Sequence, residues 1–436
     1  MFSERLRSHH DVEHRLDELL GLNRRRPALL ADRALKKKLK EKPTGASGGV
    51  YFHVPHCDKI CEFCNLNRKP LKGVDLDDYT EYLVSEIKAY GKYPYIREKH
   101  IESVYFGGGT PTVLNAGHFE RLLKALGEHF NLSGDCEITV ESTQHNLGAH
   151  KASELAACGV NRFSIGIQTF SGRGRKLLGR TYSAEKAADE LLALRDAFKG
   201  VLGIDIIYSY PDQSIDELRA DARMCIDSGV DSVSFYSLMI HSGSSMSGAI
   251  ERGELPFRRD INFDLERHNL FYETLTNGGF TLLELSKLAR PGKDKYRYIH
   301  VQYEGKDLVP IGSGAGGRIS GYSIYSMSPK IRFVSPPAPR REKYARVLGL
   351  LQFGTYDPAA LCANLGSGAE ARAASAAAIA TIETFVKEGL LKKERASYTL
   401  SPEGIFWGNN MAAALLEALI RIEGFIPRGF AAVIKV

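Results

Sequence analysis

Three cysteines stand within eight residues in the segment Cys57-Asp58-Lys59-Ile60-Cys61-Glu62-Phe63-Cys64. Their spacing is C-x3-C-x2-C, and they follow an apolar run at 50–54 that is typical of a strand. Thiolates at this spacing can ligate three corners of a cubane iron–sulfur cluster, which leaves one iron open to a small chelating molecule. A structural zinc site prefers four ligands and would need His53 or His56 here, while buried inert thiols are a further alternative.

Short apolar runs alternate with longer amphipathic patterns on the C-terminal side of this segment. Strands are predicted at 50–54, 101–106, 137–141, 162–167, 201–208, 232–236 and 280–285, with helices at 79–90, 118–130, 151–157 and 184–198. This repeated order predicts an α/β fold with parallel strands and crossover helices, an open or closed (β/α) barrel. Ligands of such folds bind at the carboxyl ends of the strands, where the polar and glycine-rich segments of this chain fall.

The two ends of the chain differ from this central part. Residues 1–48 are polar, basic and helix-prone, and the Gly/Ser/Pro-rich segment 43–49 is a linker or turn signal. Beyond 325, prolines at 329, 336, 337 and 339 mark a boundary, followed by helical patterns and a short apolar run at 397–400. We therefore expect a basic helical extension (1–48), the barrel (49–325) and a helical, winged-helix-like domain (326–436).

Composition excludes several classes of protein. The 436 residues are 43% hydrophobic and 25% charged, an ordinary globular balance that suits two or three domains. The apolar run 411–420 is too short to span a bilayer and the charged start has no signal-peptide core, so we expect a cytoplasmic protein without a membrane span. Seven cysteines, an odd number with three crowded together, indicate a reducing compartment.

The net charge of +6 is mild for this length. Basic residues concentrate at 24–26 and 36–40, which we interpret as a solvated helix face and not as a nucleic-acid-binding surface. A docking surface for an acidic partner is the alternative. The four remaining cysteines are expected only to pack in the interior.

The cysteine segment and its lead-in resemble the radical S-adenosylmethionine (SAM) superfamily. The lead-in Tyr51-Phe52-His53-Val54-Pro55-His56-Cys57 is similar to the Y-x-H-x-P-x-C motif of the oxygen-independent coproporphyrinogen III oxidase class. The resemblance implies a partial (β/α)6 barrel and a [4Fe–4S] cluster ligated by Cys57, Cys61 and Cys64. It also implies that the amino and carboxylate groups of SAM chelate the unique iron, and that an electron from the cluster cleaves SAM to a 5′-deoxyadenosyl radical.

A glycine-rich motif, Gly107-Gly108-Gly109-Thr110-Pro111-Thr112, follows the next predicted strand. Glycines there let backbone amides approach a ligand, although a tight βα turn has the same pattern. The resemblance implies that Gly108, Gly109 and Thr110 bind SAM. It implies the same for Glu141, which ends the following predicted strand.

Later strands carry further residues that match the class in order. For three of them the resemblance implies contacts with a second SAM molecule: Gln168, Arg180 and Asp205. Taken singly, the arginine and the aspartate would more often form a structural ion pair. Near the cluster, the resemblance implies cofactor contacts for Tyr51 and Phe63 and a catalytic role for Tyr51 and His53.

One position departs from the coproporphyrinogen oxidases. Those enzymes carry a further cysteine two residues after the third ligand, where this chain has Leu66. The runs 65–69 and 285–292 look more like the haem-utilisation branch, radical SAM methyltransferases that open haem without oxygen. The resemblance thus implies a radical C-methyltransferase that opens haem to a linear tetrapyrrole with two SAM molecules. The alternatives are oxidative decarboxylation of coproporphyrinogen, methylation or cyclopropanation of another substrate, and a haem-binding chaperone.

Such an enzyme needs haem or a related tetrapyrrole as substrate and a flavodoxin-like or other low-potential electron donor, and we expect a monomer. Three cations are candidates for the substrate's propionates from position alone: Arg290, Lys287 and Arg318. Four histidines are candidate ligands of haem iron: His53, His56, His145 and His241. We interpret all of them except His53 as packed or capping residues.

Overall fold

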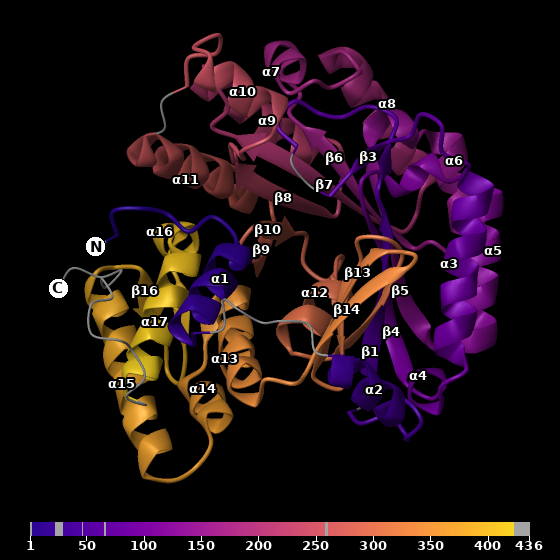
Figure 1. Ribbon diagram of the computed structural model, residues 1–436. Helices are drawn as coiled ribbons and strands as arrows, with labels where there is room; N and C mark the ends of the chain where they lie inside the picture. Colours follow the sequence, from indigo (N-terminus) through magenta and orange to yellow (C-terminus); the bar gives the residue numbers. More distant parts are fainter. Residues whose placement is uncertain (1, 22–28, 46, 65–66, 258–259, 423–436) are drawn as a thin grey trace.

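The structure is a computed structural model that describes residues 2–21, 29–45, 47–64, 67–257 and 260–422. Its centre is one large sheet with the order β14-β13-β12-β11-β1-β4-β5-β6-β7-β8-β10-β9 (Figure 1). Six parallel strands, each followed by helix, form its middle: β1 (Ser47–Val54), β4 (His100–Gly108), β5 (Asn131–Thr143), β6 (Arg162–Gln168), β7 (Val201–Tyr208) and β8 (Ser232–Ser237). The sheet has two ends, at β14 and β9, so the predicted partial barrel is confirmed.

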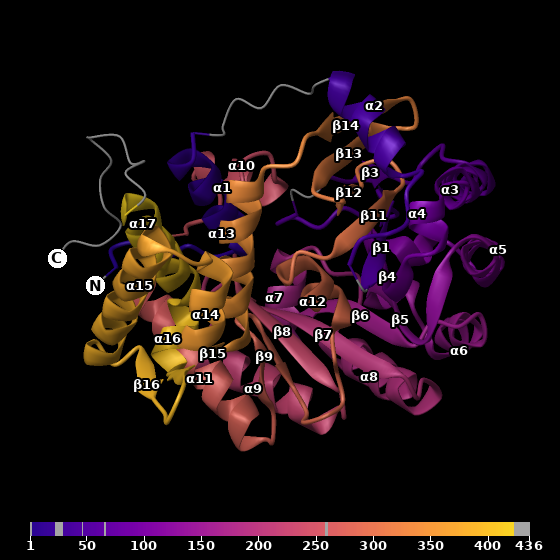
Figure 2. The same ribbon diagram turned by 90° about the horizontal axis from the view of Figure 1, so that it is seen from below.

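Amphipathic helices cover the outer face of these strands (Figures 1 and 2). They are α3 (Leu76–Gly91), α5 (Ala116–His129), α6 (Ala149–Ala157), α8 (Ala184–Ala197), α9 (Ile215–Asp227) and α11 (Ile261–Asn277). In α5, Asn115 caps the first turn by accepting a hydrogen bond from the His118 amide at 3.0 Å, and Phe119 on the next turn packs against Phe106 of β4. Local caps and buried apolar faces therefore fix the helices around the sheet.

The inner face of the barrel is polar. Side chains alternate along β6, where Phe163 and Ile165 join the core beneath the helices while Arg162 and Ser164 point the other way. Shorter elements lie between these strands and helices: β2 (His56–Cys57), β3 (Lys69–Pro70), α4 (Pro94–Arg97), η1 (Pro111–Val113), η2 (Gln144–Asn146), α7 (Gly172–Leu177), α10 (Ser245–Glu251) and α12 (Arg297–Tyr303). A polar interior of this kind can hold charged ligands that an apolar barrel core would exclude.

Two edges extend the barrel beyond its six β/α units. On one side β11 (Asp307–Ile311) runs parallel to β1, and β12 (Gly316–Ile319), β13 (Tyr322–Ser328) and β14 (Ile331–Ser335) follow in antiparallel order. On the other side β10 (Lys287–Ala289) and β9 (Thr281–Glu284) are antiparallel, so the strand predicted at 280–285 is present in part but does not continue the parallel series. Strand β13 spans residue 325, and the three-domain division stays a prediction.

The prediction of a linker or turn over residues 43–49 is wrong for its last three residues. Strand β1 begins at Ser47, and Gly48 and Gly49 pair with β11 and β4. A side chain at Gly48 would lie 2.8 Å from the Asp307 carbonyl oxygen. The glycines therefore mark a close approach of backbones within the sheet, a role that composition does not distinguish from a linker.

The C-terminal part is helical, as the sequence predicted, and it carries a small three-stranded sheet that was not predicted. Its elements are α13 (Pro339–Leu350), η3 (Leu351–Phe353), β15 (Thr355–Tyr356), α14 (Pro358–Leu365), α15 (Ala369–Lys387), β16 (Leu391–Lys393), β17 (Tyr398–Leu400), α16 (Pro402–Phe406) and α17 (Gly408–Ile422). Among the described residues, the structure contains no helix with the length and apolar character needed to cross a bilayer.

The two N-terminal helices pack on different parts of the molecule. Helix α1 (His9–Leu19) buries Val12 and Leu16 in the C-terminal core beside α17, whereas α2 (Leu29–Lys38) buries Leu35 against the barrel near β14. The lysine cluster at 36–40 includes Lys36, which is exposed and pairs with Asp32 at 2.7 Å. The arginines at 24–26 lie outside the described residues.

A buried ion pair closes the lower end of the barrel. Arg162 donates from Nε and Nη2 to the two Asp294 oxygens at 3.0 and 2.9 Å, and both side chains are almost fully buried. Burial opposes ionisation of Asp294, but the adjacent guanidinium holds the pKa of this carboxyl below its usual range. We expect Arg162→Met to destabilise the protein by about 3–5 kcal/mol, because it leaves a buried carboxylate unpaired.

Denaturant unfolding followed by circular dichroism measures this loss. The matched control is Arg297→Met, since Arg297 pairs with Asp135, whose side chain is 71% exposed, and should cost about 1 kcal/mol or less. Equal losses in the two variants would contradict the assigned role of the buried pair.

Candidate active site

The three cysteines lie on the loop that leaves β1, at the carboxyl ends of the barrel strands. Cys57 is buried and Cys61 and Cys64 are half-buried, and none of the three is in a disulfide within the described residues. Thr110 donates to the Cys57 sulfur at 3.4 Å, and Arg180 donates from Nη1 to the Cys61 sulfur at 3.1 Å. Burial raises the pKa of the Cys57 thiol, and the Thr110 hydrogen bond opposes that change. Residues from three strand ends thus converge on the sulfurs.

Asp58 anchors the cysteine loop to the end of β5. It accepts hydrogen bonds from His145 Nε2 at 2.7 Å and Asn146 Nδ2 at 3.0 Å. Burial opposes its ionisation, yet these two partners hold the pKa of Asp58 below the usual value. His145 is therefore a packed, partnered histidine, in line with its interpretation from the sequence, whereas its contact with Asp58 was not predicted.

The donor set fits an iron–sulfur cluster in its chemistry. Three thiols on one short loop, two of them contacted by polar side chains from other strands, match the soft ligands that such clusters take. Within the described residues, no three histidine, cysteine or acidic side chains are grouped to hold a single metal ion. In a cubane each cysteine ligates a different iron, so its ligands need not be grouped around one point. Leu66, where related oxidases carry another cysteine, lies outside the described residues.

Tyr51 and His53 form a short hydrogen-bonded chain on the inner face of β1. His53 Nε2 lies 3.0 Å from the Asn67 carbonyl oxygen, which only accepts, so this nitrogen carries the proton. Nδ1 then accepts from the Tyr51 hydroxyl at 3.0 Å. Burial lowers the pKa of His53, which favours this neutral form. Both ring nitrogens are engaged by protein groups here, an arrangement that positions the ring and leaves no lone pair for haem iron.

The glycine-rich motif packs directly on the lead-in to the cysteines. The amides of Gly109 and Thr110 donate to the carbonyl oxygens of Val54 and His56 at 2.8 and 2.9 Å. Gly108 has a φ of 116°, a conformation that favours glycine. A Cβ atom at Gly109 would lie 2.7 Å from backbone atoms of Pro55. The glycines thus let the backbone of the motif pass close to the backbone of residues 54–56, and this contact also holds Thr110 against Cys57.

We expect Gly109→Ala to weaken SAM binding by about tenfold, because the loop must shift away from Pro55 by a few tenths of an ångström or more. Equilibrium dialysis of cluster-reconstituted protein measures the effect. Gly127→Ala is the control, since Gly127 lies within α5 with open space where an alanine methyl group would lie, and it should bind SAM unchanged. Unchanged binding in Gly109→Ala would contradict the role of this approach.

Glu141 lies beside this motif on the inner face of β5. Its Oε1 accepts from the Tyr105 hydroxyl at 2.6 Å and its Oε2 from the Gly108 amide at 3.2 Å. Burial raises the pKa of Glu141 to about 7, and the negative charge of Asp205 contributes to the rise. A carboxyl with this pKa can bind as an acid or as a carboxylate near neutral pH.

Gln168 and Arg180 meet at the end of β6. Gln168 has a φ of 74°, which costs a residue with a side chain about 1–2 kcal/mol. Arg180 donates from Nη2 to the Gly166 carbonyl oxygen and from Nη1 to Cys61, while its buried Nε has no hydrogen-bond partner among the described residues. Asp205 lies on the neighbouring strand β7, in register with Gly166. The structure thus brings the three residues predicted for a second SAM molecule to adjacent strand ends.

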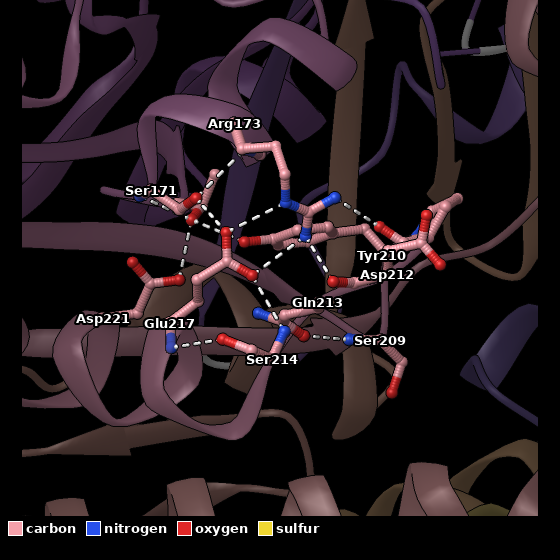
Figure 3. A network of polar contacts seen from close by, with 12 residues as sticks. Ser171, Arg173, Ser209, Tyr210, Asp212, Gln213, Ser214, Glu217 and Asp221 are labelled. Atoms are coloured by element: carbon pink, nitrogen blue, oxygen red, sulfur yellow. Dashed lines mark hydrogen bonds and ion pairs between the residues drawn. The ribbon is translucent and has the colours of Figure 1, made fainter.

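A polar network holds the turn that follows Gln168 (Figure 3). Asp221 of α9 accepts from the Phe170 amide at 2.6 Å and the Thr169 hydroxyl at 2.8 Å. Beside it, Glu217 accepts from Arg173 of α7, and Arg173 also donates to the Pro211 carbonyl oxygen. This support was not predicted from the sequence, where its one readable signal is the capping box at the start of α9.

The remaining predicted residues are placed in different surroundings. Phe63 packs on a small apolar cluster near α10, and its predicted contact with a cofactor stays a prediction. Arg290 donates to the carbonyl oxygens of Val230 and Ile226 at the lower end of the barrel, and Arg318 donates to that of Lys306. Of the three predicted propionate-binding cations, Lys287 alone lies on the inner face.

Two further histidines are candidate haem ligands from the sequence. His56 has a buried Nδ1 without a hydrogen-bond partner in the described part of the chain and packs edge-on against Tyr79. His241 lines a cavity of about 440 Å³ together with Met239 and Ile240, and the N-terminal segment contributes Arg5, among others, to the same cavity. Ile240 and Phe63 both pack against the same apolar cluster, although no residue of the cysteine loop lines this cavity.

A parallel α/β barrel that presents three cysteines beyond its first strand is the architecture of a radical SAM protein. The family model of the radical SAM superfamily matches residues 51–225. Coproporphyrinogen III oxidase (HemN) from Escherichia coli has the same fold, with a TM-score of 0.72 at 20% identity over 87% of this chain and 92% of that one.

Sequence comparison narrows the class. The chain is 28% identical to anaerobilin synthase of Escherichia coli O157:H7 over 383 residues, which cover 85% of this chain and 84% of that protein. It is 30% identical to the haem chaperone HemW of Lactococcus lactis over 290 residues, 66% of this chain and 73% of that protein. The chain therefore belongs to the radical SAM superfamily, in the coproporphyrinogen oxidase-like class that includes these haem-related proteins. Membership implies a [4Fe–4S] cluster and SAM as its cofactors.

Proposed function

We propose that this protein is a radical SAM methyltransferase that opens haem, or a closely related tetrapyrrole, to a linear product without oxygen and with two SAM molecules. The observation that carries the proposal is the extent of the match to anaerobilin synthase, which covers 85% of this chain and 84% of that protein. The match to HemW covers 66% of this chain. Likeness to anaerobilin synthase thus extends over more of the molecule, including part of the chain outside the barrel.

The site supports this chemistry residue by residue. Cys57, Cys61 and Cys64 would hold the cluster, which when bound supplies the electron for reductive cleavage of SAM. Thr110 and Arg180 hold the sulfurs of Cys57 and Cys61 by hydrogen bonds and so orient the ligand loop. We assign SAM contacts to the backbone of Gly108 and Gly109 and to Glu141, at the strand ends beside that loop.

A second SAM molecule would bind at Gln168, Arg180 and Asp205. The strained turn after Gln168 is held by Asp221, so its backbone groups are positioned before a ligand arrives. Tyr51 and His53 are hydrogen-bonded to each other, and His53 is hydrogen-bonded to Asn67, which follows the cysteine loop. We assign them to positioning and to exclusion of water, because both nitrogens of His53 are already engaged.

The cavity between the N-terminal segment and residues 239–241 is the proposed entrance for the tetrapyrrole. Its lining includes the apolar side chains Leu6, Met239 and Ile240 and the cation Arg5, and the carboxylates Asp11 and Glu18 also line it. Arg7 and Arg15 of the same lining are ion-paired with Asp264 and Glu417. A planar substrate with carboxylate groups needs this combination of apolar cover and cations. A low-potential donor such as a flavodoxin-like protein is proposed as the electron source.

Anaerobic turnover tests the proposal. Reconstituted protein with haem, SAM and an electron donor should yield 5′-deoxyadenosine, S-adenosylhomocysteine and a linear tetrapyrrole of changed mass, which mass spectrometry of the product identifies. Loss of carboxyl groups from coproporphyrinogen III would instead assign the oxidase reaction. Stoichiometric haem binding with no SAM cleavage would assign a chaperone role, the alternative that the HemW likeness favours.

A further inference from the structure

A row of four residues crosses the barrel interior from β6 to β10. Gly166 is in register with Asp205, Asp205 with Ser234, and Ser234 with Lys287. Residues paired in this way place their side chains on the same face of a sheet. The outer face is taken by residues such as Phe235, whose ring packs against Phe271 of α11 at 5.5 Å. The row containing Lys287 therefore faces the inside of the barrel.

The Lys287 ammonium has no ionic or hydrogen-bonding partner within the described residues. The residue is 2% exposed, and its Nζ lies 4.9 Å from the centre of the Tyr296 ring. Arg162, a neighbouring buried cation, differs from Lys287 in this respect, because its guanidinium makes two hydrogen bonds to the Asp294 carboxylate. A buried cation without such a partner is costly unless a ligand supplies the missing anion.

The surroundings of Lys287 contain negative charge but no group that pairs with it in the described part of the chain. Burial and the nearby Arg162 lower the pKa of Lys287, whereas the negative charges of Asp205, Asp294 and Glu284 act in the opposite direction. Asp294 is already taken up by its hydrogen bonds to Arg162. Asp205 is two strands away across the short side chain of Ser234, a spacing of about 10 Å between backbones. Asp205 also lacks a hydrogen bond or ion pair to any described residue. The two opposite charges thus face the same interior space without forming an ion pair.

We propose that Lys287 binds a carboxylate group of a ligand in the barrel interior, opposite Asp205; this inference rests on the proposed function. Two ligands of the proposed reaction carry such a group. A second SAM molecule that is not on the cluster has a zwitterionic methionyl end, whose ammonium suits Asp205 and whose carboxylate suits Lys287. A tetrapyrrole propionate suits Lys287 alone. Lys287 is in this view a binding residue beside the reaction centre.

Binding titrations with matched ligand pairs test the proposal on cluster-reconstituted protein. Lys287→Met keeps the length of the side chain and removes its charge, and Lys293→Met, at an exposed lysine of the following loop, is the control. The ligand pairs are SAM with decarboxylated SAM, and haem with haem dimethyl ester. We expect Lys287→Met to weaken the binding of one of the two acids about tenfold, as for a lost charged hydrogen bond. Binding of the carboxylate-free analogue of that acid should weaken less than twofold. The acid that is affected identifies the source of the carboxylate.

The inference is overturned if Lys287→Met binds SAM and haem as tightly as the parent protein does. It is also overturned if the substitution weakens the binding of each acid and of its carboxylate-free analogue by the same factor. Lys287→Gln is the second variant, in case the methionine protein does not fold, and thermal unfolding checks both. The outcome is separable from the proposed function. If haem is neither bound nor converted, the proposed function fails, and the SAM pair still tests Lys287.

Discussion

Cys57→Ala protein, purified without oxygen, is expected to lack the iron–sulfur cluster and to produce no 5′-deoxyadenosine from SAM. Cys57 is the buried member of the three cysteines, and its sulfur accepts a hydrogen bond from Thr110 of the glycine-rich motif. Removing it leaves two thiols, Cys61 and Cys64, on the outer part of the loop. Two thiolates cannot hold three corners of a cubane, so loss of the cluster should be complete.

The fold should survive this substitution. Loss of one buried sulfur removes little apolar surface and should cost about 1 kcal/mol. Iron and sulfide analysis measures the cluster, and chromatography of the reaction measures 5′-deoxyadenosine. Cys158→Ala is the control, because Cys158 caps α6 and its thiol donates to the Ala116 carbonyl oxygen, far along the chain from the loop. Normal iron content in Cys57→Ala would contradict the assigned ligand set.

The same variant tests where haem binds. If haem binds in the proposed cavity beside Met239 and Ile240, Cys57→Ala should still bind haem while SAM cleavage is lost. The binding measurement is an absorption titration with haem. A variant that lost haem as well would place the haem against the cluster loop itself and would remove the support for a separate entrance.

The local sequence predicted the fold well, and it also supplied the candidate ligand loop, for a physical reason. Strand and helix periodicity is encoded within short segments, and a C-x3-C-x2-C loop carries its whole ligand set within eight residues. Gly109 and Glu141 were also readable, because both stand at the carboxyl ends of predicted strands. Short segments do not determine which residues pair between two strands that are distant in sequence.

The contacts that were missed all depend on how such strands pair. Asp58 meets His145 across 87 positions, and Asp221 meets Phe170 across 51. Arg290 was an equally good propionate-binding candidate as Lys287 by position, yet the strand pairing directs Arg290 to backbone carbonyl oxygens and Lys287 to the interior. Likewise, the helical N-terminal extension was predicted, but Val12 packs in the C-terminal core and Leu35 on the barrel, a division that helix periodicity does not encode.

SAM binding is expected to strengthen about tenfold between pH 6 and pH 8, and Glu141→Gln is expected to remove this dependence. Burial raises the pKa of Glu141 to about 7 in the ligand-free protein. Bound SAM would favour the carboxylate, because its amino and hydroxyl groups donate hydrogen bonds and its sulfonium is positive. Binding is then coupled to release of a proton, and below pH 7 each pH unit costs up to a factor of ten.

The variant should show which form of the carboxyl is used. An amide resembles the protonated acid, so Glu141→Gln should bind SAM like the parent protein at pH 6 and roughly tenfold or more weakly at pH 8, where the parent has a charged acceptor. Isothermal titration calorimetry in two buffers of different ionisation enthalpy counts the released proton. Glu137→Gln, four residues earlier on the same face of β5, is the control and should keep the pH dependence.

The raised pKa of Glu141 also makes the stability of the ligand-free protein depend on pH. Whereas SAM binding strengthens as pH rises, this contribution to stability falls. The folded ligand-free protein holds the Glu141 proton up to about pH 7, whereas the unfolded chain loses it near pH 4.5. Between these values the folded state binds more protons, so the contribution of Glu141 to stability falls as pH rises. Saturating SAM should reverse this trend in thermal unfolding, since bound ligand stabilises the carboxylate. If the SAM affinity of the parent protein were the same at pH 6 and pH 8, the assignment of Glu141 to the SAM site would be wrong.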